Sequence, residues 1–213
     1  MLVSVSTMPA GEKYFEYTKQ VESFADFMHL DVCDGEYNKN TCFNVDWAKK
    51  INDFSTIPLD CHLMVKHAID YAEKYIKAGV NIITAQIESF DSVEEIRAFI
   101  SFVQTHNALV GLSLEPETSI STIKPFLSNI DIAMVMSVKT GASGQEFNTS
   151  AIQKIKQLYS IKTQNNLTFK IEVDGGITNQ TANIVKLAGA DIVVSGKFVF
   201  DAQDKQKTIQ SLK

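Results

Sequence analysis

The sequence of 213 residues predicts an α/β fold, a (β/α)8 TIM barrel. Short apolar runs typical of strands alternate with longer stretches in which apolar residues recur at helical spacing. The alternation continues through eight strands, the number that closes such a barrel. A doubly wound open sheet is the alternative, but that fold usually has a glycine-rich turn after its first strand, and none follows residues 2–6.

Eight segments have the length and apolar content of buried strands. They are Leu2–Ser6, Phe27–Val32, Leu59–Met64, Asn81–Ile87, Leu109–Leu114, Ile132–Val138, Phe169–Asp174 and Ile192–Ser195. Helical apolar spacing occurs at residues 14–24, 69–76, 93–103, 152–158 and 184–188. Gly79 and Gly189 each follow such a stretch, as expected of a glycine that ends a helix. No linker divides the chain, so we expect one barrel domain over residues 1–213.

Composition excludes several classes of protein. Twenty basic and 25 acidic side chains give a net charge of -5, which argues against a sequence-independent nucleic-acid binder. No apolar run approaches the roughly 20 residues of a membrane span, and the first residues lack the basic region of a signal peptide. Cys33, Cys42 and Cys61 form neither a disulfide framework nor a CxxC metal site. We therefore expect a reduced, cytoplasmic protein that binds neither nucleic acid nor a membrane.

Polar residues stand at the carboxyl ends of three predicted strands, where barrels of this kind carry their chemistry. Period-two geometry puts His29 and Asp31 on one face of the second strand. His62 lies near the end of the third strand, and Asp174 ends the seventh. Singly, each residue has an ordinary structural interpretation as a buried hydrogen-bonding group or a turn residue. Together, two imidazoles and two carboxylates suit a borderline divalent cation: Zn²⁺, Fe²⁺, Mn²⁺ or Co²⁺.

Glycines follow three neighbouring predicted strands and indicate an anion site. Backbone N–H groups beside glycine can approach an anion closely, and the loops after the seventh and eighth strands are the usual phosphate site of these barrels. The alternative is that these segments are only tight turns. The residues expected to face a phosphate are Gly141, Gly144, Gly175, Gly176, Gly196 and Lys197.

Three segments resemble signature segments of the ribulose-phosphate 3-epimerase family. They are residues 29–35 (His-Leu-Asp-Val-Cys-Asp-Gly), 59–65 (Leu-Asp-Cys-His-Leu-Met-Val) and 172–176 (Glu-Val-Asp-Gly-Gly). Residues 135–138 are similar to the family's strand-six motif, and the order of the segments is kept over nearly the whole chain. The resemblance implies a barrel of the ribulose-phosphate-binding type that inverts C3 of a phosphorylated ketose, and a homo-oligomer, either a dimer or a hexamer.

The resemblance also implies roles for individual residues. His29, Asp31, His62 and Asp174 match the family's metal ligands, and Asp31 and Asp174 match its acid/base pair. Inversion needs one ionised and one protonated carboxyl, and a divalent metal stabilises the negative charge formed on the sugar oxygens. Residues implied to contact the substrate are Ser6, His62, Met64, Met136, Gly144, Gly176 and Gly196.

Departures from the family pattern concentrate on the substrate side. Gln86 stands where the family usually has His. The loop at residues 36–40 keeps only its final Asn, and the loop at 140–145 loses a proline, a phenylalanine and a glycine. Lys197 replaces a small residue, and we expect it to contact the phosphate by charge complementarity.

These departures leave the substrate open. Ribulose 5-phosphate and xylulose 5-phosphate are favoured, with an allulose-6-phosphate 3-epimerase or a catalytically idle sugar-phosphate binder as alternatives. Decarboxylation or aldol chemistry is disfavoured, because residues 60–62 lack the lysine that such relatives use. Glu172 is expected either to orient the metal site or to form a buried ion pair with Lys170.

Overall fold

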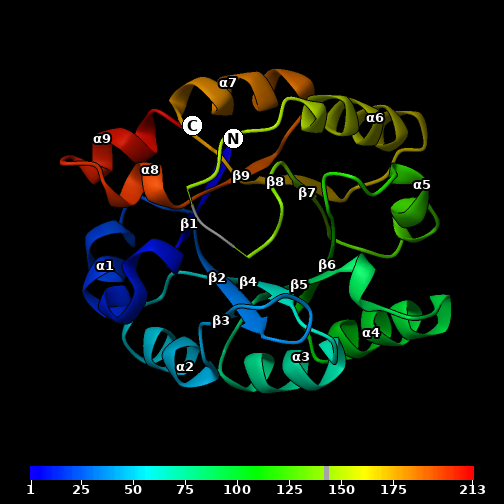
Figure 1. The fold of residues 1–213 in the computed structure, drawn as a ribbon, viewed down its shortest axis with the longest axis horizontal. Helices are drawn as coiled ribbons and strands as arrows, with labels where there is room; N and C mark the ends of the chain where they lie inside the picture. The colour runs from blue at the N-terminus through cyan, green and yellow to red at the C-terminus, as the bar shows by residue number, and fades with distance from the viewer. Residues whose placement is uncertain (142–143) are drawn as a thin grey trace.

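Eight parallel strands close into a barrel in this computed structural model, which describes residues 1–141 and 144–213. Neighbouring strands follow the order β1-β9-β8-β7-β6-β5-β4-β2, and pairing of β1 with β2 closes the ring. Figure 1 looks down the barrel and shows the helices arranged around it. The predicted fold class is confirmed. Ala142 and Ser143, within the loop assigned to the anion site, lie outside the described residues.

The elements have the following bounds in the described part of the chain. The strands are β1 (Leu2–Ser6), β2 (Phe27–Asp34), β3 (Thr41–Cys42), β4 (Leu59–Met64), β5 (Ile82–Gln86), β6 (Leu109–Leu114), β7 (Ile132–Met136), β8 (Lys170–Asp174) and β9 (Ile192–Ser195). The helices are α1 (Tyr14–Val21), α2 (Val45–Phe54), α3 (Ala68–Lys77), α4 (Val93–Thr105), α5 (Ile120–Ile123), α6 (Ser150–Gln164), α7 (Asn179–Ala188), α8 (Lys197–Phe200) and α9 (Lys205–Gln210). Three short 3-10 helices are η1 (Met8–Lys13), η2 (Ile87–Ser89) and η3 (Lys124–Phe126).

Helix α4 shows how the sequence forms the outer layer. Its apolar residues recur at three- and four-residue spacing, and Phe99 and Val103 are fully buried against the barrel. Burial of a side chain the size of phenylalanine contributes about 1.5–3 kcal/mol. Ser92 caps the start of the helix: its hydroxyl accepts the Glu95 N–H, a cap that contributes about 1 kcal/mol.

Glycine ends helix α7 as predicted. Gly189 has φ of 111°, a left-handed conformation that favours glycine, and its N–H bonds to carbonyls of the last turn. Helix α2 was not among the predicted helices, because only Ala48 and Ile51 in it are buried. Its start is set by Asn44, whose side chain accepts the Trp47 N–H.

Strand β2 is longer than the sequence indicates. It runs on to Asp34 and there pairs antiparallel with the two-residue strand β3, with Cys33 opposite Cys42. This β2–β3 hairpin was not predicted, because a two-residue strand is too short to show period-two alternation. The predicted strands at 81–87 and 132–138 are shorter in the structure, ending at Gln86 and Met136.

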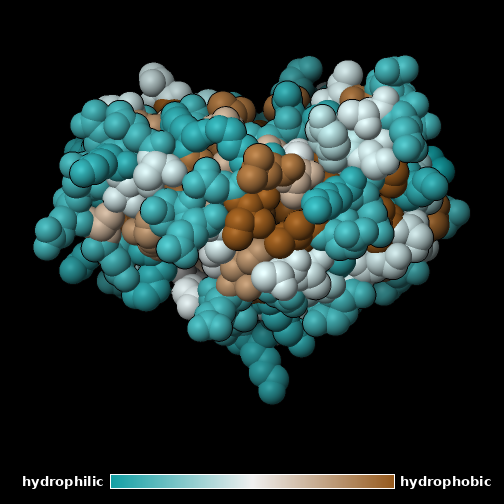
Figure 2. Space-filling view, turned by 90° about the horizontal axis from the view of Figure 1, so that it is seen from above, coloured by the Kyte–Doolittle hydropathy of each residue, from teal (hydrophilic) through white to brown (hydrophobic). Residues whose placement is uncertain are grey.

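One face of the molecule carries a cluster of apolar side chains. Figure 2 shows this cluster on the side where α6 and α7 lie. Large exposed hydrophobic residues on these two helices are Tyr159, Ile184 and Leu187, and Leu187 is 89% exposed. Among the residues with described placement, no helix combines the length and the hydropathy needed to cross a membrane.

Candidate active site

Strand register brings four predicted residues to one point at the carboxyl end of the barrel. Asp31 on β2 lies beside His62 on β4, and Met136 on β7 lies beside Asp174 on β8. One ligand atom from each of His29, Asp31, His62 and Asp174 lies within 4.8 Å of the others. Within the cluster, His29 Nε2 lies 3.6 Å from Asp31 Oδ1, and His62 Nδ1 lies 4.0 Å from Asp174 Oδ2.

Asp60 supports His29 from below the cluster. Its Oδ2 lies 2.7 Å from His29 Nδ1 and accepts the Ser4 hydroxyl at 2.7 Å. This contact directs His29 Nε2 into the cluster, the arrangement in which a carboxylate orients a metal-binding histidine. Sequence reasoning missed both Asp60 and Ser4 as site residues. The available signal was that Asp60 shares a strand face with His62, and Ser4 with Ser6.

Asp31 and Asp174 differ in protonation. Burial would raise the pKa of Asp31, but the imidazoles of His29 and His62 together with the Ser6 hydroxyl outweigh burial, and the pKa is lowered. Ser6 adds to this by donating its hydroxyl to Asp31 Oδ2 at 2.7 Å. Burial and then the charge of Asp31 raise the pKa of Asp174 to about 7. Near neutral pH, one carboxyl is therefore ionised and the other is partly protonated.

Two buried nitrogens in the cluster lack a hydrogen-bond partner among the described residues. They are His29 Nε2 and His62 Nδ1. A buried polar atom without a partner is costly, so its presence suggests a ligand at that position. Two imidazole nitrogens and two carboxylates are a donor set for Zn²⁺, Fe²⁺, Mn²⁺ or Co²⁺, so the residues fit a divalent ion.

Protons compete with a metal for this site. Burial would lower the pKa of His29, but Asp60 and Asp31 outweigh it and raise the pKa well above its usual value. Burial and the charge of His29 lower the pKa of His62 to about 4, so this imidazole is neutral at pH 7. A metal ion at the cluster would displace the proton of His29.

A cavity of about 610 Å³ opens beside the cluster. Its volume lies in the range of small-molecule sites. His29 and His62 are fully buried and do not line it. The predicted residues that do line it are Ser6, Asp31, Met64, Met136, Gly141, Gly144, Asp174, Gly175, Gly176, Gly196 and Lys197.

Gly141, Gly144, Gly175 and Gly176 all have a positive φ and no room for a Cβ, as Gly176 and Gly144 illustrate. Gly176 has φ of 59°, and a Cβ there would collide with the backbone of Phe147. Gly144 has φ of 80°, and a Cβ there would come within 2.9 Å of the Lys197 side chain. Lys197 Nζ lies 2.6 Å from Asp201 Oδ2, and both side chains are more than half exposed. Lys197 is thus placed at the cavity, with its charge paired to Asp201.

Glu172 lies one layer below Asp174 and is fully buried. Neither of its carboxyl oxygens has a hydrogen-bond partner in the described part of the chain. Burial and the nearby Asp60 raise its pKa well above the usual range. Lys170 is exposed, so the alternative of a buried ion pair between Lys170 and Glu172 is wrong.

The expectation that all cysteines are reduced is also wrong. Cys33 and Cys42 form a disulfide across the β2–β3 hairpin, with their Cα atoms 4.9 Å apart. A count of cysteines does not show which two a hairpin will place opposite each other, and only the hairpin brings this pair within bonding reach. Cys61 is free and buried.

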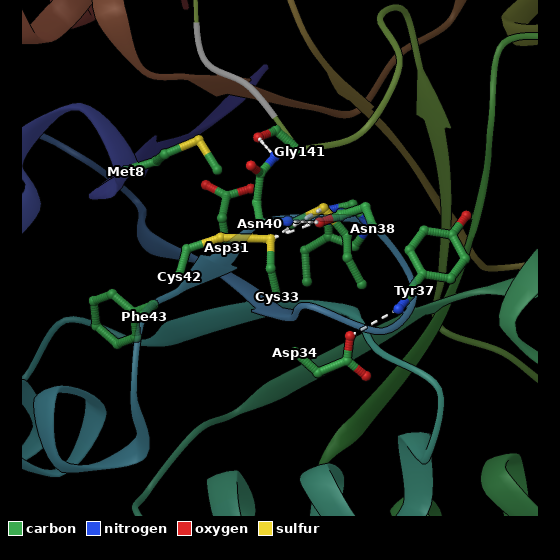
Figure 3. The surroundings of a disulfide bond; sticks show 12 residues. Met8, Asp31, Cys33, Asp34, Tyr37, Asn38, Asn40, Cys42, Phe43 and Gly141 are labelled. Carbon is green, nitrogen blue, oxygen red and sulfur yellow. Dashed lines mark hydrogen bonds between the residues drawn. A yellow bond between two sulfur atoms is a disulfide. The ribbon is translucent and has the colours of Figure 1, made fainter.

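The disulfide lies at the mouth of the site. Figure 3 shows it beside Asp31, with Asn40 directed to the carbonyl of Gly141. Asp34 Oδ1 accepts the Tyr37 N–H at 2.9 Å and holds the turn between the two strands. The loop at residues 36–40 is therefore fixed at its base by the disulfide and at its end by the loop after β7.

Comparison with known proteins gives a consistent result. The sequence profile of the Ribulose-phosphate 3 epimerase family matches residues 3–200. A ribulose-phosphate 3-epimerase of Aquifex aeolicus (strain VF5) is 34% identical over 190 residues, which cover 89% of this chain and 84% of that protein. The chloroplastic ribulose-5-phosphate-3-epimerase of Arabidopsis thaliana is 32% identical over 215 residues, covering 100% of this chain and 76% of that protein.

Solved structures share the fold at low sequence identity. A 3-hexulose-6-phosphate synthase from Salmonella typhimurium has a TM-score of 0.75 at 15% identity, and the match covers 100% of this chain and 96% of that one. At this identity the likeness concerns the barrel alone.

Proposed function

Because the chain belongs to the ribulose-phosphate 3-epimerase family, we propose that it interconverts ribulose 5-phosphate and xylulose 5-phosphate by inverting C3. Membership makes the chain an isomerase that acts on carbohydrate phosphates. Beyond family membership, we propose the identity of the ketose, the metal and the role of each site residue.

The observation that carries the mechanism is the pairing of unlike carboxyls at one cavity. Asp31 has a lowered pKa and accepts the proton on C3, which is acidic because it is alpha to a carbonyl. Asp174, whose pKa in the metal-free protein is raised to about 7 by burial and by the charge of Asp31, delivers a proton to the opposite face. In the reverse direction the two residues exchange roles.

His29 Nε2, His62 Nδ1, Asp31 and Asp174 would hold the divalent ion. When bound, such an ion supplies Lewis-acid stabilisation of negative charge on the sugar oxygens. Met64 and Met136 line the same cavity and cover the reacting carbon with apolar surface that offers no competing proton. Backbone N–H groups at Gly144, Gly176 and Gly196 bind the phosphate.

The decisive assay compares two substrates in D₂O. Purified protein loaded with Mn²⁺ is incubated separately with ribulose 5-phosphate and with allulose 6-phosphate, each with and without a chelator. We expect faster turnover of ribulose 5-phosphate, deuterium at C3 of the product, and loss of both with chelator. Faster turnover of allulose 6-phosphate would reassign the substrate, and binding without turnover of either would make the chain an idle binder.

We also propose that the protein is a cytoplasmic homo-oligomer. The exposed apolar residues of α6 and α7 (Tyr159, Ile184 and Leu187) support self-association, which sedimentation velocity measures directly. Disulfides are rare in the cytoplasm, so the Cys33–Cys42 disulfide argues against the cytoplasmic part of this proposal, and thiol alkylation at the moment of cell lysis tests it. Free thiols at Cys33 and Cys42 would support it, and an oxidised pair would oppose it.

A further inference from the structure

A chain of hydrogen bonds leads from the mouth of the barrel to His62. Glu115, which follows β6, accepts the Gln86 side-chain N–H at Oε1, at 3.3 Å. Gln86 Oε1 accepts the Ser113 hydroxyl. Ser113 Oγ lies 3.1 Å from His62 Nε2. The register of β5 and β6 places Gln86 beside Ser113, and all members except Glu115 are fully buried.

The carboxylate at the end of this chain sets the direction of every hydrogen bond in it. A carboxylate oxygen only accepts, so Glu115 must face the N–H₂ end of the Gln86 amide. The amide oxygen of Gln86 then faces Ser113 and takes its single hydroxyl proton. The Ser113 oxygen is left as an acceptor, so His62 must donate to it through Nε2–H.

Other donors confirm that Glu115 acts as an acceptor. The Tyr37 hydroxyl donates to its Oε1 at 3.3 Å, and the Thr140 backbone N–H donates to its Oε2 at 3.3 Å. The Thr140 hydroxyl donates to Oε1 as well. A flipped Gln86 amide would direct its oxygen at this carboxylate and its N–H₂ at Ser113, and would lose the bond to Glu115.

We propose that Glu115 is a positioning residue that fixes His62 as the Nε2–H tautomer and thereby presents the Nδ1 lone pair to the metal site. Nδ1 is the nitrogen of His62 that lies in the cluster, 4.0 Å from Asp174 Oδ2, without a hydrogen-bond partner among the described residues. The opposite tautomer would direct an N–H at a bound cation and would leave the buried oxygen of Gln86 unpaired. The inference rests on the metal site of the proposed function, and it assigns a role to Gln86 at the position where the family usually has His.

The tautomer is measurable in the metal-free protein. Histidine labelled with ¹⁵N gives distinct long-range proton–nitrogen patterns for the two neutral tautomers. Replacement of the exposed His67 and His106 by Gln leaves two histidines to assign. We expect His62 to be the Nε2–H tautomer at pH 7, and the Nδ1–H tautomer in the wild type would overturn the proposal whatever the variants do.

Variants then test the role of Glu115. Glu115→Ala should populate the Nδ1–H tautomer of His62 and raise the Kd for Co²⁺ about tenfold, as loss of an outer partner of a metal ligand does. Glu115→Gln keeps an oxygen that accepts from Gln86 and should restore the wild-type tautomer. Tyr37→Phe removes a different hydrogen bond to the same carboxylate and should leave the tautomer unchanged.

The outcomes separate this inference from the proposed function. A folded Glu115→Ala variant with wild-type tautomer and wild-type Kd for Co²⁺ would refute the role of Glu115. A wild-type protein that shows the Nε2–H tautomer but binds no Co²⁺ would support the hydrogen-bond chain and contradict the metal site instead.

Discussion

Two regions of the site are built in different ways: the floor, formed by strand residues of the barrel, and the mouth, formed by the β2–β3 hairpin and the loop after β7. The floor residues are Ser4, His29, Asp31, Asp60, His62 and Asp174. At the floor, strand pairing fixes each side chain, as with Asp31 beside His62, and Asp60 and Ser4 support His29 through short buried hydrogen bonds. At the mouth, the β2–β3 hairpin and the loop after β7 are held by the Cys33–Cys42 disulfide and by the bond from Asn40 to Gly141. Under the proposed function, residues on the barrel strands carry the reaction, and we expect the choice of substrate to depend on the loops of the mouth, because loops tolerate change better than the strands they connect.

Removing either carboxyl of the floor should have the largest effect. In Asp31→Asn or Asp174→Asn, a carboxyl proposed to move the C3 proton becomes an amide that cannot, and we expect kcat to fall by about 10³-fold. Deuterium incorporation at C3 measures the loss, and thermal unfolding checks that the fold is kept. Asp53→Asn on the surface of α2 is the matched control. Undiminished exchange in either site variant would contradict the roles assigned here.

The mouth should respond to loss of its disulfide with a change in stability. The bond closes a sequence separation of 9, and a loop of that length is worth about 2–3 kcal/mol in the chain-entropy account. We therefore expect Cys42→Ser to lower the free energy of unfolding by about that amount, measured by urea denaturation without reductant. The same comparison in the presence of dithiothreitol is the control, because both proteins then lack the bond. Equal stability without reductant would mean that the hairpin is held by its other contacts.

The floor was predictable from the sequence to a greater degree than the mouth. Period-two alternation placed His29 and Asp31 on one face, and the rule that strand ends carry the chemistry selected His62 and Asp174. Neither pattern determines the register between neighbouring strands. The hydrogen bond from Ser4 to Asp60, which are 56 residues apart, therefore could not be predicted. In the same way, the link from Gln86 to Ser113 depends on which residues of β5 and β6 lie side by side.

The structure of the mouth could not be predicted from the sequence for a different physical reason. Its segments are too short to show a periodic pattern of apolar residues, and β3 has only two residues. The pairing of Cys33 with Cys42 depends on that strand. The resemblance identified where the loops depart from the family, but a departure does not say which contacts replace the lost ones. In the structure, Tyr37 and Thr140 from these two loops both donate hydrogen bonds to Glu115.

The raised pKa of Asp174 predicts an effect of pH on stability in the metal-free protein. A carboxyl titrates near 3.9 when unfolded and at about 7 here, so the folded state binds more protons between these values. Asp174 therefore destabilises the fold increasingly as pH rises from about 4 to 7, by at most about 1.4 kcal/mol per pH unit. Asp174→Asn should accordingly gain stability relative to the wild type over pH 5 to 7 and level off above pH 7. A constant difference in urea denaturation across this range would contradict the shift.

Substitution of Lys197 tests whether a charge at the mouth contributes to substrate binding. We expect this substitution to have the smallest effect of those predicted here. Its ion pair with Asp201 is exposed on both sides, and such pairs contribute little, so a phosphate can replace Asp201 as the partner at low cost. Lys197→Met keeps the apolar stem that lies against Gly144 and removes the charge. We expect KM for the sugar phosphate to rise about fivefold with kcat unchanged, which corresponds to about 1 kcal/mol for one exposed charged contact. Lys207→Met on α9 is the control. If KM does not change, the phosphate is bound by the glycine backbone alone. The lysine that stands where the family usually has a small residue then does not affect substrate binding.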